Sequence, residues 1–511
     1  MELSQEQQEA FDKYIEGHNI FITGPGGSGK SALIRLIYAH ACAHEKHIQV
    51  TAMTGCAAFL LNCKAKTLHS WAGIGLGNGT TETLITRIKS KQFWKKAWTD
   101  VDVLIVDEVS MLSMKLFETL NAIGKAVRKN RQPFGGIQLV FLGDFYQLPP
   151  VGDKDDADTR RFCFESAEWN SVFARDCQIQ LIKIFRQTDD TYAAILNQIR
   201  EGKIKKSSNN LLMQYVGRAT DPSLVSEPTK LFPTRNKVEA INCTQMALLP
   251  GEAKEFHVKY LSDMEISNRE KLMKRQRFSE KDIATEMDFL AGKLICDKEL
   301  TLKIGAQVMC IVNMPPSSSG ALDICNGSQG IIVSFCSLTG NPRVKFNSGL
   351  ERTMMRHVWE SEHIPGVGVA QVPLILSWAV TIHKSQGATL DAAEIDAGSG
   401  IFECGQTYVA LSRVKSLQGL YLTSFDASRI RIHRKVKEYY DELNLSVKNI
   451  NVSPDATAAA TATDVTSVMT AEEVVSVEVC EEEEEDCKNV CFDKYAYGGD
   501  DSLRVIVTKR P

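Results

Sequence analysis

A glycine-rich segment at residues 24–31 carries the residue types that bind phosphate. It reads Gly-Pro-Gly-Gly-Ser-Gly-Lys-Ser and lies between an apolar run and a helical pattern. In this order of strand, loop and helix, backbone N–H groups can close around phosphate oxygens. The Lys30 amine would neutralise the β- and γ-phosphates, and the Ser31 hydroxyl would ligate Mg²⁺. The segment predicts a nucleoside triphosphate site built from Gly24, Gly26, Gly27, Ser28, Gly29, Lys30 and Ser31.

Two adjacent carboxylates follow the apolar run 103–106. Asp107 would hold Mg²⁺, and Glu108 would polarise the attacking water. A solvated strand end is the alternative interpretation, because acidic residues are mostly exposed. The position of the pair after the glycine loop favours the catalytic interpretation. Together the two motifs predict hydrolysis of a nucleoside triphosphate.

Three further polar residues follow apolar runs later in the chain. The amide of Gln147 could report on the γ-phosphate without adding charge. Arg186, in Phe-Arg-Gln, and Arg413, in Ala-Leu-Ser-Arg, carry planar guanidinium groups that can stabilise transition-state charge. Each arginine alone would more often form a surface ion pair. Two arginines at one nucleotide would imply a second sheet domain that closes on the first.

The elements that must position these residues follow from the hydrophobic pattern. The first 185 residues alternate helical patterns with short apolar runs, which predicts a parallel sheet with crossover helices, its strands at 20–23, 48–53, 103–106, 138–142 and 178–182. Residues 74–100 interrupt that alternation, and a basic aromatic part, 89–98, favours an amphipathic helix over a DNA contact.

The second half of the chain changes pattern three times. Residues 252–298 are rich in charge and predicted to be helical, whereas 305–360 show short β-type runs typical of a small antiparallel barrel. Alternation of strands and helices resumes over 374–440. After residue 444 no core pattern remains, so a disordered tail is expected.

Charge is divided unevenly along the 511 residues, whose formal net charge is -4. Residues 446–511 hold 14 acidic and 6 basic residues, a net charge of -8, so the remaining 445 residues carry a net +4. This mildly basic body is compatible with nucleic acid but does not identify it, because binding depends on where Lys and Arg cluster.

Composition excludes several other classes of protein. The longest nearly uncharged apolar stretch, 372–382, is shorter than the roughly 18 residues of a membrane-spanning helix. The 14 cysteines form no zinc-ligand pattern, which favours a reducing intracellular compartment. No basic leader precedes residue 9, so we expect the nucleus or cytoplasm, and a viral origin stays open.

Taken in order, the motifs resemble those of superfamily one B DNA helicases. They are Leu3-Ser4-x-x-Gln7, 24–31, Thr54 to Ala58, Thr67 to Trp71, Asp107-Glu108, 143–150, 185–187, 381–387 and 410–413. More narrowly, Pro-Phe-Gly-Gly-Ile-Gln-Leu followed by Gly-Asp-Phe-Tyr-Gln-Leu-Pro-Pro-Val is similar to the signature of the petite-integration-frequency (Pif) helicases. The resemblance covers residues 3–440.

The resemblance implies an α/β protein of two RecA-like P-loop domains with parallel sheets. Residues 1–180 would form the first domain, with 74–100 as a small wedge insertion. Residues 181–445 would form the second, with an SH3-like β-barrel insertion at about 300–365, and 446–511 would be the acidic tail.

The same resemblance implies ATP-driven 5′-to-3′ translocation on single-stranded DNA. Gln7 would recognise adenine, Gln147 would couple the nucleotide to DNA, and Arg186 and Arg413 would come from the second domain. The DNA strand would contact Thr54, Thr67, His69, Ser70, Thr381, His383, Lys384 and Ser385. Short polar groups suit this role, because a motor must hold phosphates without reading sequence. For Trp71, base stacking and core packing are both open.

The expected cofactors are ATP and Mg²⁺, and the expected partners are single-stranded and tailed or forked duplex DNA. G-quadruplex DNA is a further candidate substrate, no membrane is involved, and a monomer is expected. Two alternatives remain: a RecD-like motor subunit of a recombination complex, and a nucleotide-gated switch that clamps DNA without moving. The roles implied are DNA replication, repair or recombination.

Overall fold

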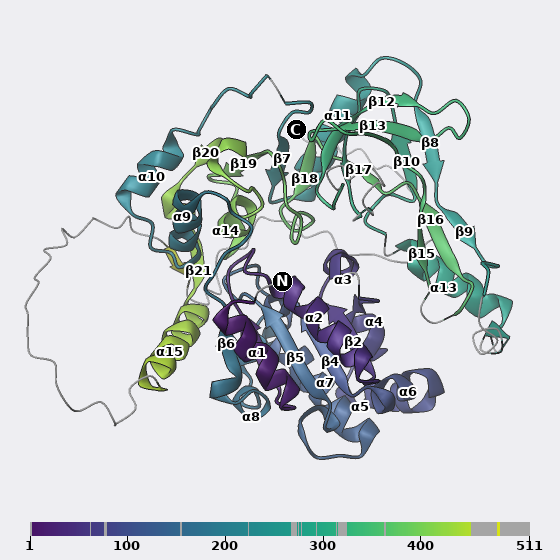
Figure 1. Ribbon diagram of the computed structural model, residues 1–511, viewed down its shortest axis with the longest axis vertical. Helices are drawn as coiled ribbons and strands as arrows, with labels where there is room; N and C mark the ends of the chain where they lie inside the picture. Colours follow the sequence, from purple (N-terminus) through teal and green to yellow (C-terminus); the bar gives the residue numbers. More distant parts are fainter. Residues whose placement is uncertain are drawn as a thin grey trace, which may run out of the picture.

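The computed structural model describes most of the chain. The described residues are 3–450 and 478–480, apart from 62, 76–78, 154–155, 223, 267–272, 274, 277, 293, 313, 315–323 and 362–363. Two parallel sheets dominate, and in Figure 1 the first lies in the lower half of the molecule and the second in the upper half. No helix in this part of the chain is long and apolar enough to cross a membrane.

The first sheet has six parallel strands in the order β3-β2-β4-β5-β1-β6. They are β1 (Ile20–Thr23), β2 (Ile48–Ala52), β3 (Lys66–Thr67), β4 (Val103–Asp107), β5 (Gln138–Gly143) and β6 (Gln178–Gln180). The five predicted strands are confirmed, with ends that differ by at most two residues. β1, β4 and β5 are almost wholly buried, as expected where helices cover both faces of a sheet.

Strand register brings the polar motifs to one edge of this sheet. Thr23 pairs with Gly143, and Ala52 pairs with Asp107. The glycine loop, the two carboxylates and the segment after β5 therefore leave the sheet side by side. Helices α1 (Gln5–Ile15), α2 (Lys30–Ala43), α3 (Gly55–Leu61), α4 (Leu68–Ala72) and α7 (Met114–Arg128) connect or flank these strands.

The excursion at 74–100 is helical. It contains α5 (Thr81–Ser90) and α6 (Gln92–Asp100), so the helical interpretation of 89–98 is confirmed, with a break at Lys91. Trp98 is buried and its indole N–H donates to the Ala72 carbonyl at 3.1 Å. Trp71 is only 3% exposed and its ring centroid lies 4.6 Å from that of Trp98. Trp71 is therefore a core residue, and the base-stacking interpretation is not supported.

The second sheet has four parallel strands in the order β18-β7-β19-β20. They are β7 (Thr229–Phe232), β18 (Ala379–Thr381), β19 (Ala393–Ala397) and β20 (Leu420–Phe425). Helices α9 (Asp190–Arg200), α10 (Lys206–Met213), α11 (Arg235–Leu248) and α14 (Gln406–Leu411) accompany them. This sheet and the first confirm the predicted α/β class.

An antiparallel sheet is inserted before β18. Its order is β14-β13-β12-β11-β17, with β11 (Gln307–Cys310), β12 (Gln329–Phe335), β13 (Pro342–Phe346), β14 (Glu351–Thr353) and β17 (Leu374–Leu376). The antiparallel pairing agrees with the expectation for 305–360, and closure into an SH3-like barrel stays a prediction.

The helical prediction for 252–298 is wrong over its first part. β8 (Lys254–His257) pairs with β10 (Glu299–Leu302), and β9 (Lys259–Leu261) pairs with β16 (Gly368–Gln371), which also pairs with β15 (His357–Glu360). Only α13 (Glu280–Gly292) is a long helix here among the described residues. In β8 the buried Phe256 lies between two exposed residues, so burial alternates with a period of two residues. The charged side chains of the strand conceal this alternation in the sequence.

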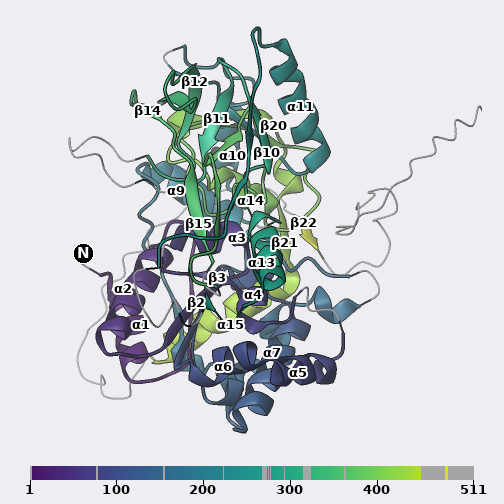
Figure 2. The same cartoon turned by 90° about the vertical axis from the view of Figure 1, so that its right-hand side faces the viewer.

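The last helix returns to the first sheet. α15 (Arg434–Ile450) follows β21 (Arg431–His433), and its Tyr439, Tyr440 and Leu443 lie in the same buried cluster as Phe21 and Phe145. Figure 1 and Figure 2 both show α15 against the lower half of the molecule. Although the sequence assigns 434–445 to the second domain, this helix completes the core of the first.

Two short parts of the predicted tail have structure. α15 continues to Ile450, and β22 (Glu478–Cys480) pairs in parallel with β21. The prediction of disorder is therefore corrected for these two parts. The rest of 446–511 lies outside the described residues.

Candidate active site at the junction of the two sheets

The glycine loop joins β1 to α2 as the sequence predicts. Gly29 caps the helix in the left-handed region, with φ 86°, and Gly27 has φ 89°. A Cβ atom on Gly27 would come within 2.4 Å of the Arg186 Cβ. Glycine is therefore needed at residue 27 for conformation and for close approach.

The Lys30 amine lies against this loop. Its Nζ donates to the Gly24 carbonyl at 2.6 Å and to the Pro25 carbonyl at 3.0 Å. Burial lowers the pKa of Lys30, while the carboxylates of Asp144, Glu108 and Asp107 act in the opposite direction. The lysine amine thus lies at the loop among acidic groups, the position from which it can reach phosphates.

The carboxylates at the end of β4 fit a magnesium ion. Asp107 is 7% exposed, and burial together with the neighbouring charge of Glu108 raises its pKa to about 7. The Glu108 backbone N–H donates to Asp107 Oδ1 at 2.9 Å. A buried carboxylate of raised pKa gains by binding a cation, and Mg²⁺ prefers one or two protein oxygens plus phosphate oxygens. Asp107 and the Ser31 hydroxyl supply that donor type.

Arg186 and Arg413 reach the loop from the second sheet. Measured from a Cβ built on Gly26, Arg186 Nη1 lies at 3.5 Å and Arg413 Nη2 at 3.7 Å. Burial, and then the charge of Arg186, lower the pKa of Arg413 to about 9. Arg413 is buried and Arg186 half-buried. Two guanidinium groups at one backbone segment repel each other unless an anion lies between them, so their convergence indicates a phosphate site.

Tyr408 also reaches Gly26 and was not predicted from the sequence. Its hydroxyl oxygen accepts a hydrogen bond from the Gly26 N–H at 2.8 Å. Tyr408 lies on α14, five residues before Arg413, in the same apolar segment. Its only signal in the sequence was a hydroxyl three residues into a short helix, which is too weak to separate it from a core tyrosine.

Gln147 meets a second residue that the sequence did not single out. Gln386 Nε2 donates to Glu108 Oε2 at 3.1 Å and to Gln147 Oε1 at 3.5 Å. Gln386 directly follows the predicted strand contact Ser385, so it joins the predicted catalytic carboxylate of Glu108 to a predicted DNA-binding loop. Its position beside that motif was the available signal.

Gln7 lies on another face of the glycine loop. Its Nε2 donates to the Ser28 carbonyl at 3.3 Å, and its backbone and side chain complete a capping box with Ser4 at the start of α1. The cap fixes the Gln7 side chain beside the loop, as the predicted adenine contact requires.

The four predicted DNA contacts of the first domain lie around two short helices. Thr54 Oγ1 accepts from the Ala57 N–H at 3.2 Å, and Thr67 Oγ1 accepts from the Ser70 N–H at 3.3 Å. His69 and Ser70 are half-buried on α4. These caps fix the backbone around all four residues.

The four predicted contacts of the second domain differ in exposure. Lys384 is exposed and His383 half-buried, and burial lowers the pKa of His383. Ser385 is 1% exposed and donates to the Ile382 carbonyl, while Thr381 Oγ1 accepts from the Lys384 N–H. The hydroxyls of Thr381 and Ser385 thus shape the loop, whereas Lys384 and His383 present surface.

The predicted strand-contact regions of the two domains lie close together. A Cβ on Gly387, at the end of the second-domain loop, would lie 2.9 Å from Leu60 Cδ1 on α3. The structure therefore brings the groups of 54–70 and 381–385 to one side of the junction.

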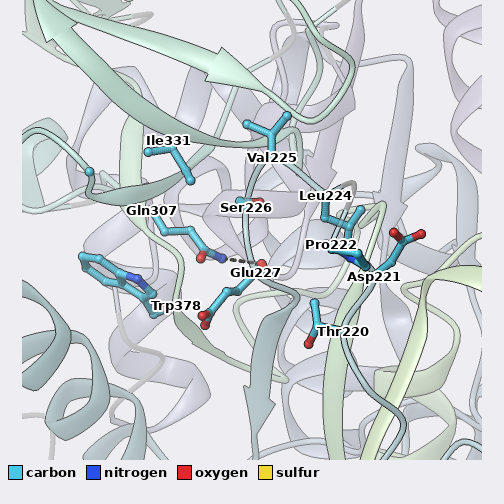
Figure 3. A pocket seen from close by; sticks show the side chains of 11 residues that line it. Thr220, Asp221, Pro222, Leu224, Val225, Ser226, Glu227, Gln307, Ile331 and Trp378 are labelled. Atoms are coloured by element: carbon cyan, nitrogen blue, oxygen red, sulfur yellow. Dashed lines mark hydrogen bonds between the residues drawn. The ribbon is translucent and has the colours of Figure 1, made fainter.

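A separate pocket of about 350 Å³ lies between the segment 220–227 and the antiparallel sheet. Figure 3 shows Gln307 pointing to Glu227, whose carbonyl accepts from Gln307 Nε2 at 2.7 Å. None of the predicted site residues lines this pocket.

Comparison with known proteins gives the family. The model for the PIF1-like helicase matches residues 2–210, and that for the DNA helicase Pif1, 2B domain matches residues 290–335. The ATP-dependent DNA helicase RRM3 of Saccharomyces cerevisiae is 32% identical, with 86% of this chain and 68% of that protein covered. The chain spans between 61% and 68% of the length of the first three curated relatives.

Solved structures show the same fold. The Pif1 helicase of Candida albicans is 34% identical with a TM-score of 0.66, covering 87% of this chain and 100% of that one. Bacteroides Pif1 with ADP-AlF4 is 26% identical with a TM-score of 0.68, covering 87% and 98%. Bacteroides Pif1 bound to single-stranded DNA has a TM-score of 0.58 at 26% identity, covering 88% and 98%.

A glycine-rich loop, two carboxylates and two arginines at the junction of two parallel sheets define a P-loop protein of two RecA-like domains. The helicase subclass follows from the two matching family models and from the relatives. The chain belongs to the PIF1-like helicase family.

Proposed function

We propose that this chain is an ATP-driven DNA helicase that translocates 5′ to 3′ on single-stranded DNA and separates the duplex ahead of it. The observation that supports this proposal most strongly is that Arg186 and Arg413 of the second domain converge at Gly26 of the first domain. Because hydrolysis then needs both domains at once, each cycle of ATP binding and product release changes how the domains contact each other.

The first domain binds the nucleotide in this proposal. Gln7 contacts adenine, the N–H groups of the 24–29 loop surround the phosphates, and Lys30 neutralises their charge. Ser31 and Asp107 hold Mg²⁺, which when bound neutralises charge on the phosphate oxygens.

Hydrolysis uses groups from both domains. Glu108 orients and polarises the attacking water, and Arg186 and Arg413 stabilise charge on the transferring phosphoryl group. Arginines in this role contribute on the order of 10³ to 10⁵ in rate.

The coupling of hydrolysis to DNA runs through Gln386. This residue contacts Glu108 and Gln147 and adjoins the loop with His383 and Lys384. The strand lies across 54–70 and 381–385, held by polar groups that do not read sequence. The complex of Bacteroides Pif1 with single-stranded DNA supports this class of substrate.

We place this activity in replication, repair or recombination of DNA in the nucleus or cytoplasm, where thiols stay reduced. The ten free cysteines of the described part support a reducing compartment. Tailed and forked duplexes are the proposed substrates, and G-quadruplex DNA is a further one.

The test is ATP turnover by the purified full chain with and without single-stranded DNA, in the wild type and in Lys30→Ala. DNA should stimulate the wild type, and Lys30→Ala should abolish turnover while keeping some strand binding, because the strand contacts lie elsewhere. Lys203→Ala, an exposed lysine near the end of α9, is the matched control and should behave as wild type. Normal turnover by Lys30→Ala would show that the loop is misassigned.

A further inference from the structure

A buried ion pair joins the two domains behind the nucleotide site. Arg200, the last residue of α9, is 4% exposed, and Asp144, directly after β5, is 0% exposed. The Arg200 Nε donates to Asp144 Oδ2 at 2.9 Å and its Nη2 donates to Oδ1 at 2.8 Å. Such a two-point contact fixes the orientation of both groups.

Two tyrosines complete the surroundings of Arg200. Its guanidinium carbon lies 4.7 Å from the ring centroid of Tyr146 and 5.2 Å from that of Tyr440. The two rings are stacked on each other, with centroids 4.7 Å apart. Tyr146 belongs to the loop that carries Gln147, and Tyr440 belongs to α15.

The Tyr440 hydroxyl connects this cluster to the glycine loop. It hydrogen-bonds to Thr23 Oγ1, accepts from the Phe145 N–H at 3.2 Å and donates to Asp144 Oδ1 at 3.4 Å. Thr23 is the last residue of β1, immediately before Gly24. Arg200 is thus linked through side chains to the start of the glycine loop and to the loop that carries Gln147.

Residues just before α9 and at its end both contact the first domain. Arg186 precedes the helix and lies over Gly26, while Arg200 ends it and holds Asp144. The Tyr192 hydroxyl of α9 donates to the Leu411 carbonyl at 2.7 Å, which ties the helix to the segment that carries Arg413. α9 therefore links Arg200 to the segments that carry Arg186 and Arg413.

We propose that Arg200 is a positioning residue for ATP hydrolysis: it neutralises Asp144 and anchors α9 so that Gln147, Arg186 and Arg413 stay aligned with the phosphates. The inference rests on the proposed function and adds a residue that does not touch the nucleotide. Without Arg200, Asp144 is an unpaired buried carboxylate that can draw the Lys30 amine away, since both charges act on Lys30.

A charge-rescue experiment tests it. In the full chain, Arg200→Gln should lower the kcat of DNA-stimulated ATP hydrolysis by about tenfold or more with a smaller change in KM, because an unpaired buried charge disturbs the site. The double variant Asp144→Asn with Arg200→Gln should recover much of that kcat, since two neutral amides of similar shape replace the pair. Arg175→Gln is the matched control: this arginine also contacts α15, through Glu442, but at the surface.

Loss of structure is separated from loss of positioning by two further measurements. The first measurement is strand binding without nucleotide, which should persist in Arg200→Gln. The second is the ratio of base pairs unwound to ATP hydrolysed, which should fall in that variant. An unchanged kcat in Arg200→Gln, or a double variant no better than Arg200→Gln, would overturn the inference. If the wild type hydrolyses ATP but fails to unwind DNA, the proposed function falls, and the kcat comparison still decides the role of Arg200.

Discussion

At the residue scale, the chemistry depends on side chains that meet from distant parts of the chain. Arg413 is 2% exposed and lies beside Arg186 at a loop almost 400 residues earlier in sequence. A sequence motif can show that an arginine follows an apolar helix. It cannot show which loop that arginine faces, because this depends on how two domains pack.

Arg413→Lys tests the need for a planar, forked cation. We expect the kcat for ATP to fall by about 10³ while nucleotide affinity changes little, because the loop of the first domain supplies most phosphate contacts. Steady-state ATP turnover and binding of a fluorescent nucleotide would measure the two effects. Lys415→Ala, which removes a half-exposed lysine paired with Asp391, is the control. Turnover within about threefold of wild type in Arg413→Lys would remove Arg413 from the site.

The residues missed by sequence analysis share one property. Tyr408, Gln386 and Arg200 act through contacts that cross the domain junction. Lys30, Asp107 and Glu108 could be predicted, since a local pattern places Lys30 after β1 and the two carboxylates at the end of β4. Local pattern carries no information on these pairings, whose partners lie between 56 and 382 residues apart in the sequence.

At the element scale, most strands of the first sheet were predictable because their apolar runs are continuous. β8 was missed, since its charged residues conceal a two-residue period, and β9 was missed because it has only three residues. β3 was missed because it has only two residues. α15 begins inside the predicted alternation of strands and helices over 374–440, but its packing on the first domain depends on Tyr439, Tyr440 and Leu443, which no periodicity assigns to a particular sheet.

The packing of α15 against the first domain predicts how two leucine substitutions change the free energy of unfolding. Leu443 is 1% exposed in the core of the first domain, so Leu443→Ala should lower the free energy of unfolding by about 2 to 5 kcal/mol. Leu445, two residues later, is 61% exposed, and Leu445→Ala should change it by no more than about 0.5 kcal/mol. Chemical denaturation of both variants would measure the difference. Equal effects would contradict the packing of α15 against the first sheet.

At the scale of the whole molecule, charge is separated between a body of net +4 and a C-terminal segment of net -8. A motor must release DNA repeatedly, and a modest basic excess suits this better than strong overall charge. The acidic segment can also compete with DNA phosphates for the basic body.

Deleting residues 446–511 should therefore preserve unwinding and tighten binding of single-stranded DNA at low salt. The gain should shrink as salt rises, because screening weakens long-range charge interactions. Fluorescence anisotropy with a labelled oligonucleotide across a salt series would measure it. Loss of folding or of activity would show that the segment, which includes the end of α15 and β22, belongs to the functional core.

In the proposed function, closure of two RecA-like domains on ATP drives movement in one direction along a DNA strand. The most direct measurement compares unwinding of two matched duplexes by the purified full chain, one with a 5′ single-stranded tail and one with a 3′ tail. We predict ATP-dependent separation of the 5′-tailed duplex and little of the 3′-tailed one, with Lys30→Ala inactive on both. Unwinding of the 3′-tailed duplex alone, or DNA binding without strand separation on either substrate, would contradict the account.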